Sequence, residues 1–473
     1  MGPVPELDDT AGACARRLTD ADAVLLASHI DADGLTSAAI ASTALERAGV
    51  PHEVVFKKQL DETEIASIAA REYDTVLFTD FGSGQLDDIT AHEEAGDFEP
   101  VVADHHQPAD AETQYHLNPL LEGIDGASEL SGAGASYVLA RALAAETGDP
   151  DGNRDLAALA VVGAVGDMQA VEGELVGANS AIVGEGSAVG VLDEGTDLAL
   201  YGKQTRPLPR LLEYASEVRI PGVTNDEKGA VGFLEGLPVD LHRGDGEWRR
   251  WVDLSDDEKQ TVASSLLQRA LERGVPPGKA ERLVGTTYTL TDEATGTTLR
   301  DASEFSTLLN ATARYERADV GLAVCLGDRG DALDRARTLL ENHRRNLSEG
   351  LEQVKRRGVD QAEHIQYFDA GDEIRETIVG IVAGMALGVE GVDGGRPIIA
   401  FAEKNDEETK VSARGTGRLV GQGLDLSAVM TEASRAVGGD GGGHDIAAGA
   451  TIPTGEEAEF VETADALVAE QLG

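Results

Sequence analysis

Cysteines and long apolar runs are both scarce in this sequence, and each scarcity argues against a class of protein. The 473 residues include two cysteines, Cys14 and Cys325, which form neither a metal-binding spacing nor a disulfide framework. No stretch approaches the roughly 20 apolar residues that span a bilayer. The acidic N-terminus, MGPVPELDDT, lacks the apolar segment of a signal peptide. We therefore expect a soluble, cytoplasmic protein with reduced thiols.

Basic residues are scarce as well. Lys and Arg number 39 against 86 Asp and Glu, and the formal net charge is −47. Such a charge opposes compaction unless concentrated salt shortens the Debye length, to roughly 3 Å near 1 M. The acidic residues are spread along the whole chain, so an acidic tail explains them poorly, and we expect adaptation to a salt-rich cytoplasm such as that of a halophilic archaeon. The lack of basic residues does not exclude nucleic-acid binding, because concentrated salt removes most of the gain from counterion release.

The first 170 residues alternate between strand-like and helix-like patterns. Apolar runs predict strands at 23–28, 53–56, 75–79 and 99–103. Helical spacing is found at 35–48, 62–71, 86–94, 131–146 and 155–165. This alternation is typical of βαβ units, so the sequence predicts a parallel sheet covered by helices on both faces.

The remaining chain divides into three further parts, because its length is too great for one typical core. The predicted domains are 1–170, 171–330 (an insertion or helical middle region), 331–360 (a connecting helix) and 361–473 (a smaller α/β domain). The middle region has a predicted helix at 256–273. Its Trp248-Arg249-Arg250-Trp251 cluster could stack bases but is more typical of a surface or interface patch. In the last domain we expect strands at 365–368, 397–402 and 410–415, and helices at 376–387 and 456–471.

Carboxylates and imidazoles follow three of the predicted strands at the point where each strand ends. They are His29, Asp31 and Asp33 after the first strand, Asp80 after the third, and Asp104, His105 and His106 after the fourth. Ligand sites in open parallel sheets lie at the carboxyl ends of the strands, so we expect these side chains to converge. Oxygen ligands combined with imidazole suit Mn²⁺ or Mg²⁺.

The order of these loops indicates how the work is divided among the side chains. Asp80 comes from the middle loop, so we predict that its carboxylate bridges two ions, which in phosphoryl hydrolysis lie about 3.5–4 Å apart. His105 is expected to be a ligand, Asp104 to fix an imidazole, and His106 to donate a hydrogen bond to the substrate. Asp167, which follows the apolar segment ALAVVGAVG, would complete the ligand set of the second ion. Each cluster alone could be an acidic turn; together they predict a two-metal phosphoesterase.

These motifs resemble those of the DHH phosphoesterase superfamily: HxDxDG, an Asp after the third strand, DHH and a later GD. Ser412-Ala413-Arg414 and the glycine-rich run from 438 to His444 resemble the associated DHHA1 substrate-binding domain. The segments SHIDADGLTSAAI, TDFGSG and LSGAGASYVLA are most similar to the archaeal RecJ-like exonucleases, including the GINS-associated nuclease. Bacterial members have Asp at the position of His29, which also favours the archaeal branch. The resemblance covers 1–170 and 360–473.

The resemblance implies two divalent cations, Mn²⁺ first and Mg²⁺ as the alternative, and a role for each matched residue. One ion would be held by His29, Asp31 and Asp80, and the other by Asp33, Asp80, His105 and Asp167. His106, Asp104 and Asp80 would be the catalytic residues, with His106 near the scissile phosphate. The substrate-binding residues would be Arg414, Gly441, Gly442, Gly443 and His444. The implied partners are single-stranded nucleic acid and, through residues 171–330, the replication factor GINS.

Three functions remain open at this point. The first is a metal-dependent exonuclease specific for single strands of DNA, RNA or both. The second is a phosphodiesterase of small substrates, either very short RNAs or cyclic dinucleotides, which the long insertion disfavours. The third is a non-catalytic replication scaffold, which predicts lost metal ligands, whereas every matched ligand position is intact.

Overall fold

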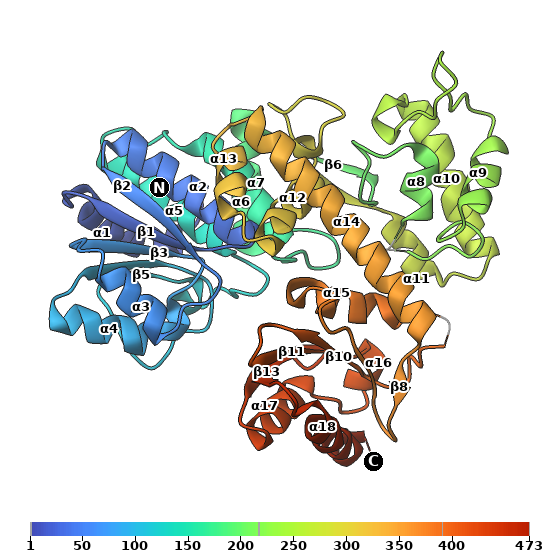
Figure 1. The fold of residues 1–473 in the computed structure, drawn as a ribbon. Coiled ribbons are helices and arrows are strands. Elements are labelled where there is room, and N and C mark those ends of the chain that lie inside the picture. Colours follow the sequence, from blue (N-terminus) through green and yellow to red (C-terminus); the bar gives the residue numbers. More distant parts are fainter. Residues whose placement is uncertain (1, 216–217, 390, 473) are drawn as a thin grey trace. The chain divides into compact units, whose positions relative to one another are not determined.

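The computed structural model describes residues 2–215, 218–389 and 391–472. The chain forms two compact units, Met1–Arg337 and Thr338–Gly473, and the boundary between them in the sequence falls within the long helix α14 (Asp331–Arg357) (Figure 1). The predicted α/β class is confirmed, with a parallel sheet in the N-terminal part, a largely helical middle and a smaller α/β domain at the C-terminus. No helix in the described ranges is both long and apolar enough to cross a membrane.

The sheet of the first unit contains five strands in the order β2-β1-β3-β4-β5, and every neighbouring pair is parallel. The strands are β1 (Val24–His29), β2 (His52–Lys57), β3 (Thr75–Thr79), β4 (Glu99–Ala103) and β5 (His116–Leu117). Strands β3 and β4 have the bounds that the sequence predicts, because every residue of β3 and all but the first of β4 are buried, as their apolar runs require. The two-residue strand β5 was not predicted.

Helices cover both faces of this sheet. They are α1 (Asp8–Thr19), α2 (Ala32–Ala48), α3 (Glu62–Ala69), α4 (Leu86–Ala95), α5 (Gly132–Glu146) and α6 (Ala157–Gly166). On one face, α3 and α4 pack Ile65 and Leu86 against Phe78 in a common apolar cluster. On the other face, α2, α5 and α6 contact one another closely (Figure 1), which their many alanines and glycines allow.

The middle region contains an antiparallel strand pair and a helical subdomain with a core of its own. After α7 (Gly177–Val189), strand β6 (Leu192–Leu198) pairs with β7 (Val284–Leu290). Between these strands lie α8 (Leu208–Glu213), α9 (Glu227–Glu235), α10 (Asp256–Glu272) and α11 (Pro277–Ala280). Leu211, Phe233 and Leu266 are among the buried residues of this core.

Trp251 belongs to that core and Trp248 packs against it, so the expected surface or interface patch is wrong for Trp251. Trp251 is 1% exposed, and its indole N–H donates to Asp197 at 2.9 Å. Arg249 forms a bidentate pair with Glu258, with both distances at 2.9 Å. Because intramolecular carboxylates neutralise the arginines, the segment can lie against an apolar core although its sequence is highly charged.

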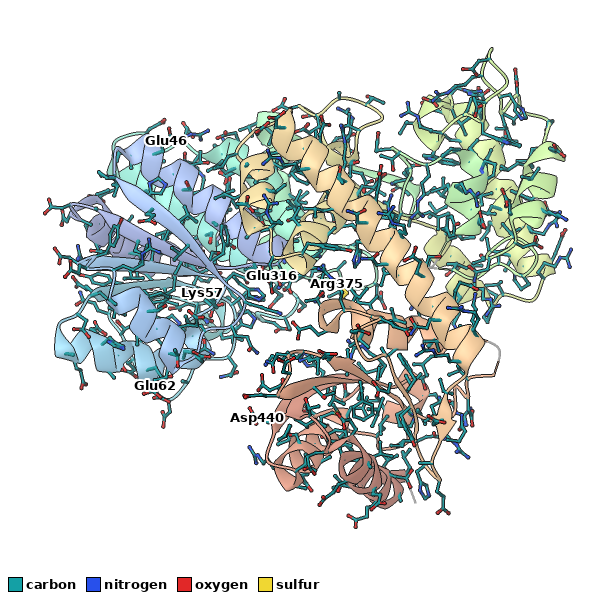
Figure 2. The ribbon with its side chains drawn as sticks, in the orientation of Figure 1. Glu46, Lys57, Glu62, Glu316, Arg375 and Asp440 are labelled. Atoms are coloured by element: carbon teal, nitrogen blue, oxygen red, sulfur yellow. The ribbon has the colours of Figure 1, made fainter. Side chains whose placement is uncertain are left out.

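Two further helices complete the first unit. They are α12 (Ala302–Arg314), which contacts α6, and α13 (Ala318–Cys325), which contacts α2. Cys14 and Cys325 are both buried, unpaired thiols. Charged side chains cover the surface instead: Figure 2 shows Glu46 and Glu62 of the first unit and Asp440 of the second projecting outward, and all three are exposed.

The second unit has a mixed six-stranded sheet in the order β12-β13-β11-β10-β9-β8. Its strands are β8 (Asp360–Gln361), β9 (Gln366–Asp369), β10 (Ile398–Glu403), β11 (Glu408–Arg414), β12 (Asp440–Gly443) and β13 (Ala447–Pro453). Its helices are α15 (Glu376–Ala386), α16 (Gly417–Val420), α17 (Leu426–Ala436) and α18 (Glu457–Leu472). Helices α17 and α18 pack on one face, and α15 with the end of α14 on the other.

The glycine run of the second unit forms the edge strand β12 and is not a loop. It pairs antiparallel with β13, and Gly441 lies opposite Ala450. A Cβ added to Gly441 would lie 2.7 Å from the Cβ of Ala450 and 2.8 Å from the carbonyl oxygen of Met430. Glycine is therefore required here by the close packing of the strand on α17.

Candidate metal centre

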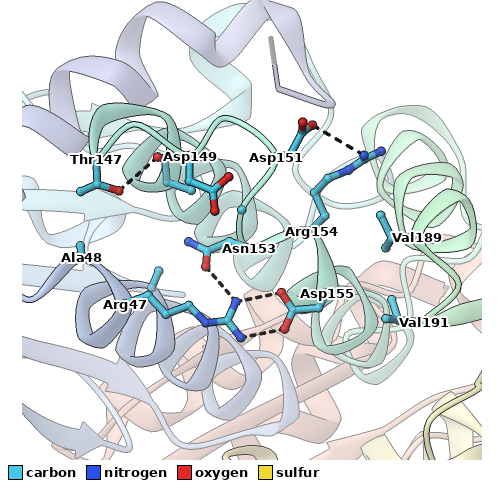
Figure 3. Close-up of a pocket in the computed structure, with 13 residues that line it drawn as sticks. Arg47, Ala48, Thr147, Asp149, Asp151, Asn153, Arg154, Asp155, Val189 and Val191 are labelled. Carbon is cyan, nitrogen blue, oxygen red and sulfur yellow. Dashed lines mark hydrogen bonds and ion pairs between the residues drawn. The ribbon is translucent and has the colours of Figure 1, made fainter.

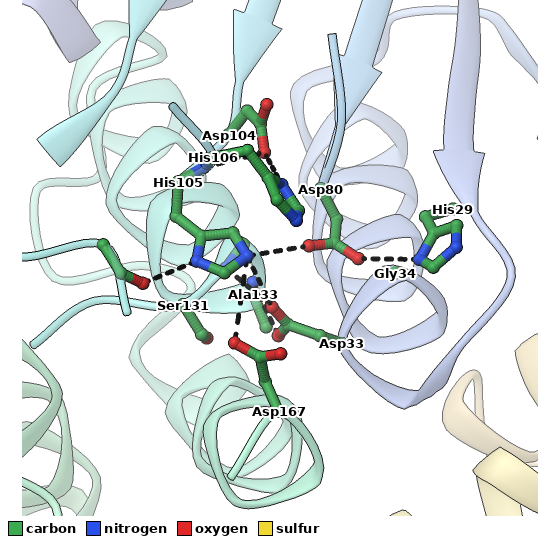
Figure 4. Close-up of polar contacts among 12 residues, drawn as sticks. His29, Asp33, Gly34, Asp80, Asp104, His105, His106, Ser131, Ala133 and Asp167 are labelled. Carbon is green, nitrogen blue, oxygen red and sulfur yellow. Dashed lines mark hydrogen bonds and ion pairs between the residues drawn. The ribbon is translucent and has the colours of Figure 1, made fainter. Parts of the chain in front are cut away.

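The predicted donors come together at one edge of the parallel sheet, as Figure 4 shows for most of them. The loops after β1, β3 and β4 meet the N-terminal ends of α2 and α5 and the C-terminal end of α6. The side chains gathered there are His29, Asp31, Asp33, Asp80, Asp104, His105, His106 and Asp167. Helix dipoles direct partial positive charge from α2 and α5 toward this cluster, and thus favour its carboxylates.

Asp80 stands between two groups of donors. Its Oδ2 atom lies 3.5 Å from His29 Nδ1, on the side where Asp31 Oδ2 is 3.2 Å from the same nitrogen. Its Oδ1 atom lies 3.4 Å from His105 Nε2, on the side of Asp33 and Asp167. Within each group the potential ligand atoms lie within 4.8 Å of one another. One carboxylate thus faces two clusters, each of a size that suits one cation.

In the neutral ring of His105, the nitrogen that faces the donor cluster is an acceptor surrounded by acceptors. Its Nδ1–H donates to the carbonyl oxygen of Gly126 at 2.6 Å, so the lone pair of the neutral ring is on Nε2. That nitrogen faces Asp80 at 3.4 Å, and Asp33 and Asp167 at 3.8 Å each. Acceptors at these distances need either a proton on the ring or a cation among them, and a neutral imidazole with carboxylates is a ligand set that fits Mn²⁺.

The titration behaviour of the imidazoles leads to the same conclusion. Burial alone would lower the pKa of His29 and His105, but hydrogen bonds with carboxylates and the charges of those carboxylates raise both to about 11. The hydrogen-bond partners are Asp31 and Asp80 for His29, and Asp80 for His105. In the same way, His29 and His105 lower the pKa of Asp80 although its burial opposes this. Protons on the two rings thus supply positive charge that divalent ions would bring in their place.

Among the carboxylates of the donor cluster, Asp33 and Asp167 are those whose ionised form is most disfavoured. Burial, together with the charges of Asp80 and Asp167, raises the pKa of Asp33 well above its usual range. Asp33 accepts N–H bonds from Gly132 at 2.7 Å and from Ala133 at 3.0 Å, both in the first turn of α5. Burial and Asp80 likewise raise the pKa of Asp167. Two divalent cations would neutralise the four carboxylates Asp31, Asp33, Asp80 and Asp167.

Backbone features allow the donors to approach so closely. Asp80 has a φ of +59°, a left-handed conformation that a residue other than glycine rarely adopts. A Cβ on Gly132 would lie 2.4 Å from Asp80 Oδ1, and a Cβ on Gly163 would lie 2.4 Å from Asp33 Oδ1. Glycine at these two helical positions is therefore needed for the carboxylates to occupy their places.

Asp104 lies behind the cluster and holds His106. It is fully buried, and its Oδ1 accepts Nδ1–H of His106 at 2.8 Å. Its Oδ2 accepts the backbone N–H of Ser83 at 2.9 Å. The contact between Asp104 and His106 raises the pKa of His106 and, against the effect of burial, lowers that of Asp104. The side chain of His106 is 55% exposed, so its Nε2 is open to a substrate.

Several residues that support the centre were not predicted from the sequence. Gln169 is 1% exposed, and its Nε2 donates to Asp167 Oδ2 at 2.9 Å and to the carbonyl oxygen of Gly126 at 2.8 Å. Asn179 donates to Gln169 Oε1 at 2.6 Å. A second buried network, of Ser83, His116 and Asn118, lies beneath Asp104 and His106. The sequence motifs gave no signal for these supporting residues. Only Gln169, two positions after Asp167, could have been suspected from its spacing.

The predicted substrate residues lie in the second unit. Arg414 ends β11 opposite Ala447, and Gly443 in β12 pairs with Ala448, so Arg414 and His444 lie at the same end of the sheet. The backbone N–H of His444 donates to the carbonyl oxygen of Ala447 at 2.9 Å. A Cβ on Gly380 would lie 2.5 Å from a guanidinium nitrogen of Arg414, so a glycine in α15 makes room for this arginine.

A pocket of about 510 Å³ lies in the first unit at the opposite ends of α2 and α5 (Figure 3). Its two basic side chains are both paired: Arg47 is bidentate to Asp155 at 2.7 and 2.8 Å, and Arg154 contacts Glu185 at 3.1 Å. Helix α2 alone is about 25 Å long at 1.5 Å per residue, so this pocket is remote from the donor cluster. Its ion pairs give it a structural role in joining α2 to the 149–155 segment.

Three family models match consecutive parts of the chain. Residues 23–164 match the N-terminal domain of the DHH family, residues 200–284 match the DHH-CID domain, and residues 363–470 match the DHHA1 domain. The donor cluster described above lies almost wholly within the first of these matches, with Asp167 just beyond its end.

A protein of Methanocaldococcus jannaschii, described as uncharacterized, is 29% identical over 453 residues, which cover 94% of this chain and 93% of that protein. Among solved structures, exonuclease RecJ bound to manganese has a TM-score of 0.62 at 18% identity, over 99% of this chain and 96% of that one. RecJ of Thermus thermophilus with Mn²⁺ gives 0.61 at 19% identity; the match covers 99% of this chain and 55% of that one.

CDC45 from Entamoeba histolytica gives a TM-score of 0.66 at 13% identity, over 98% of both chains. At such low identities the structural matches show a common fold, and the residues of the site carry the functional argument.

Proposed function

Since this chain belongs to the DHH superfamily and joins its DHH, DHH-CID and DHHA1 domains, we propose that it is a two-metal phosphodiesterase that degrades single-stranded nucleic acid from an end. One observation carries the proposal: the two oxygens of Asp80 face two donor groups, one with His29 and one with His105. The manganese-bound RecJ structures, which share the fold, support Mn²⁺ as the ion.

We assign His29, Asp31 and Asp80 to one ion, and Asp33, Asp80, His105 and Asp167 to the other. When bound, such ions lower the pKa of a coordinated water and neutralise charge on the phosphate. The assignment requires that His29 and His105 release their protons to the solvent as the ions bind, since a protonated ring nitrogen is no ligand.

His106 is proposed to contact the scissile phosphate. Asp104 fixes the ring through Nδ1, so Nε2 is the atom that points to the substrate. The same contact raises the pKa of His106 and thereby favours the form of the ring in which Nε2 also carries a proton. A protonated ring in this position donates a hydrogen bond to a phosphate oxygen, and its charge favours the negative charge that develops there.

Arg414 and His444 are proposed to bind a phosphate of the strand. The support is their position at one end of the sheet of the second unit, beside the tightly packed glycines of β12. A guanidinium forms bidentate bonds with phosphate, and histidine adds a further donor. Such contacts read the backbone and not the bases, as expected of an enzyme that degrades strands of any sequence.

The experiment is a substrate comparison in molar KCl with Mn²⁺. Long labelled single strands of DNA and RNA, RNAs of two to five nucleotides, and cyclic di-AMP are offered in parallel to the full chain. We expect stepwise shortening of the long strands. Preference for the short or cyclic substrates would replace the proposal by a small-substrate phosphodiesterase. Bound Mn²⁺ without hydrolysis of any substrate would favour a replication scaffold, a role for which the shared fold of CDC45 gives a precedent in architecture alone.

For residues 171–330 we retain a contact with the replication factor GINS as a proposal, which rests on the resemblance to the GINS-associated nuclease. Co-sedimentation of the full chain with purified GINS in molar KCl is the test. Independent sedimentation of the two proteins would contradict it without affecting the proposed chemistry.

A further inference from the structure

Met168 is the most exposed large apolar side chain in the described part of the chain. Its side chain is 86% exposed, and the next in order is Leu121 at 56%. In a chain with a net charge of −47, a fully solvated thioether gains nothing from burial within this molecule. A single exposed apolar side chain is common on a protein surface, so the position of Met168 in the chain, and not its exposure alone, is what matters here.

The backbone holds Met168 in an unfavourable conformation. Its φ is +57°, where a side chain crowds the backbone and glycine is preferred. The neighbouring hydrogen bonds fix the turn: Met168 N–H donates to Val165 at 3.2 Å, and Gln169 N–H donates to Ala164 at 3.1 Å. Because Gln169 is buried and anchored to Gly126, the exposed methionine is presented by a rigid turn. Strain of this kind is typical of functional sites.

This turn begins at a proposed metal ligand. Met168 directly follows Asp167, whose Oδ2 lies 3.8 Å from His105 Nε2. Consecutive Cα atoms are about 3.8 Å apart, so the exposed side chain of Met168 starts from the residue next to a proposed ligand. A nucleotide whose phosphate occupied the donor cluster would carry its base to the surface around that cluster. Of the atoms of such a substrate, the base is the apolar, flat part that suits a thioether.

We propose that Met168 contacts the base of the nucleotide whose phosphate lies at the metal centre. This inference rests on the proposed function and adds the way in which the substrate is positioned. An unbranched thioether adapts to any flat ring, so the contact is independent of sequence. Apolar contact also persists in concentrated salt, which screens the attraction between basic residues and phosphate.

Binding and hydrolysis are measured separately, with strands of ordinary composition and with strands that carry abasic residues at both ends. For Met168→Ala we expect the Kd and KM of ordinary strands to rise about tenfold, as for loss of one stacking contact, with kcat nearly constant. For the abasic strands, Kd and KM should be the same in Met168→Ala and the wild type. Met168→Leu should retain most of the affinity for ordinary strands. Leu271→Ala, at a 45% exposed apolar residue of α10, is the matched control and should match the wild type.

Each outcome bears on one statement. Equal Kd of the wild type and Met168→Ala for ordinary strands overturns the base contact, even if hydrolysis is intact. Met168→Gly removes the side chain that is unfavourable at positive φ. If Met168→Ala and Met168→Gly both lose affinity for ordinary and abasic strands to the same extent, Met168 acts only through the backbone of Asp167. That result also overturns the contact. A base-dependent loss of affinity without hydrolysis by the wild type upholds the contact and refutes the proposed function alone.

Discussion

Gln169 donates from Nε2 to Asp167 Oδ2 at 2.9 Å and so connects a buried amide to the proposed second ion. The same Nε2 donates to the carbonyl oxygen of Gly126, which also accepts Nδ1–H of His105. One buried side chain thus fixes two proposed ligands that are 62 positions apart in the sequence, from 105 to 167. Partners of this kind orient metal ligands and set their basicity.

Replacing this amide should weaken metal binding. Gln169→Met keeps the length of the side chain but removes both hydrogen bonds, so Asp167 and His105 lose a common support. We expect the affinity for Mn²⁺, measured by calorimetric titration in molar KCl, to fall about 10–100-fold. Gln59→Met, at an exposed glutamine, is the matched control. An unchanged affinity in Gln169→Met would show that the carboxylate and the ring are held by other contacts.

The bridging role of Asp80 predicts a greater loss. In Asp80→Asn both donor groups lose an anionic oxygen, and each of the two ions contributes several kcal/mol to transition-state stabilisation. We expect turnover of single strands to fall by about 10³-fold or more. Asp87→Asn, at an exposed carboxylate of α4, should leave turnover unchanged. Near-normal turnover in Asp80→Asn would refute the bridge.

Much of the fold could be predicted because the inner strands β1, β3 and β4 of the first sheet are buried on both faces. Their apolar runs stand out in the sequence, and β3 and β4 were predicted with their observed bounds. The two-residue β5 and the short helices α8 and α11, of six and four residues, lack such a signal. The longer helix α10 of the same subdomain was predicted, at 256–273. The burial of Trp251 was missed for a related reason. Its arginine neighbours are neutralised by Glu258 and Asp253, and these ion pairs can be recognised only in the three-dimensional structure.

The grouping of the donors could be anticipated for a physical reason. Parallel strands present their carboxyl ends at one edge, so residues after β1, β3 and β4 must lie close together. Gln169 and Ser83 were missed, because a supporting role depends on hydrogen bonds such as that from Ser83 N–H to Asp104, which no spacing reveals. The left-handed backbone of Asp80 was also beyond prediction, since nothing in Thr-Asp-Phe-Gly requires a positive φ at the aspartate.

The Asp104–His106 pair predicts a change in the pH profile. Asp104 raises the pKa of His106, so the ring keeps its proton to higher pH than an isolated histidine would. In Asp104→Asn the amide oxygen can still accept Nδ1–H, but the charge is lost and burial lowers the pKa of the ring. The alkaline decline of kcat should therefore begin at lower pH, and kcat at neutral pH should fall about 10²-fold.

The matched control for this profile is another histidine–aspartate pair. His92 Nδ1 lies 2.7 Å from Asp97 Oδ2, and Asp97→Asn removes that charge from the surface of the first unit. Its pH profile should coincide with that of the wild type. A profile of Asp104→Asn that declines at the same pH as the wild type would assign the alkaline decline to a group other than His106.

Glu304 predicts a pH dependence of folding. This buried residue of α12 accepts N–H of Gln204 at 2.7 Å and O–H of Thr205 at 2.5 Å, and burial raises its pKa to about 7 from 4.5. The protonated form is thus favoured in the folded state, and stability falls as pH rises from 4.5 through 7, by about 3 kcal/mol at roughly 1.36 kcal/mol per pKa unit. Urea unfolding of Glu304→Gln in molar KCl should lack this decline, whereas Glu94→Gln, at an exposed residue of α4, should show it in full.

The negative charges around Asp167 predict that Asp167→Asn stabilises the metal-free protein but reduces the stabilisation that Mn²⁺ provides. Burial and Asp80 raise the pKa of Asp167, so its ionised form destabilises the fold when no cation is present. Asp167→Asn should therefore have a higher Tm than the wild type in EDTA. Mn²⁺ at about 100 times its Kd stabilises the wild type by about 2.7 kcal/mol per site, and this gain should be smaller in the variant because a ligand is missing. Asp110→Asn, at an exposed residue, should follow the wild type in both conditions. Equal gains from Mn²⁺ in the wild type and Asp167→Asn would remove Asp167 from the ligands of the second ion.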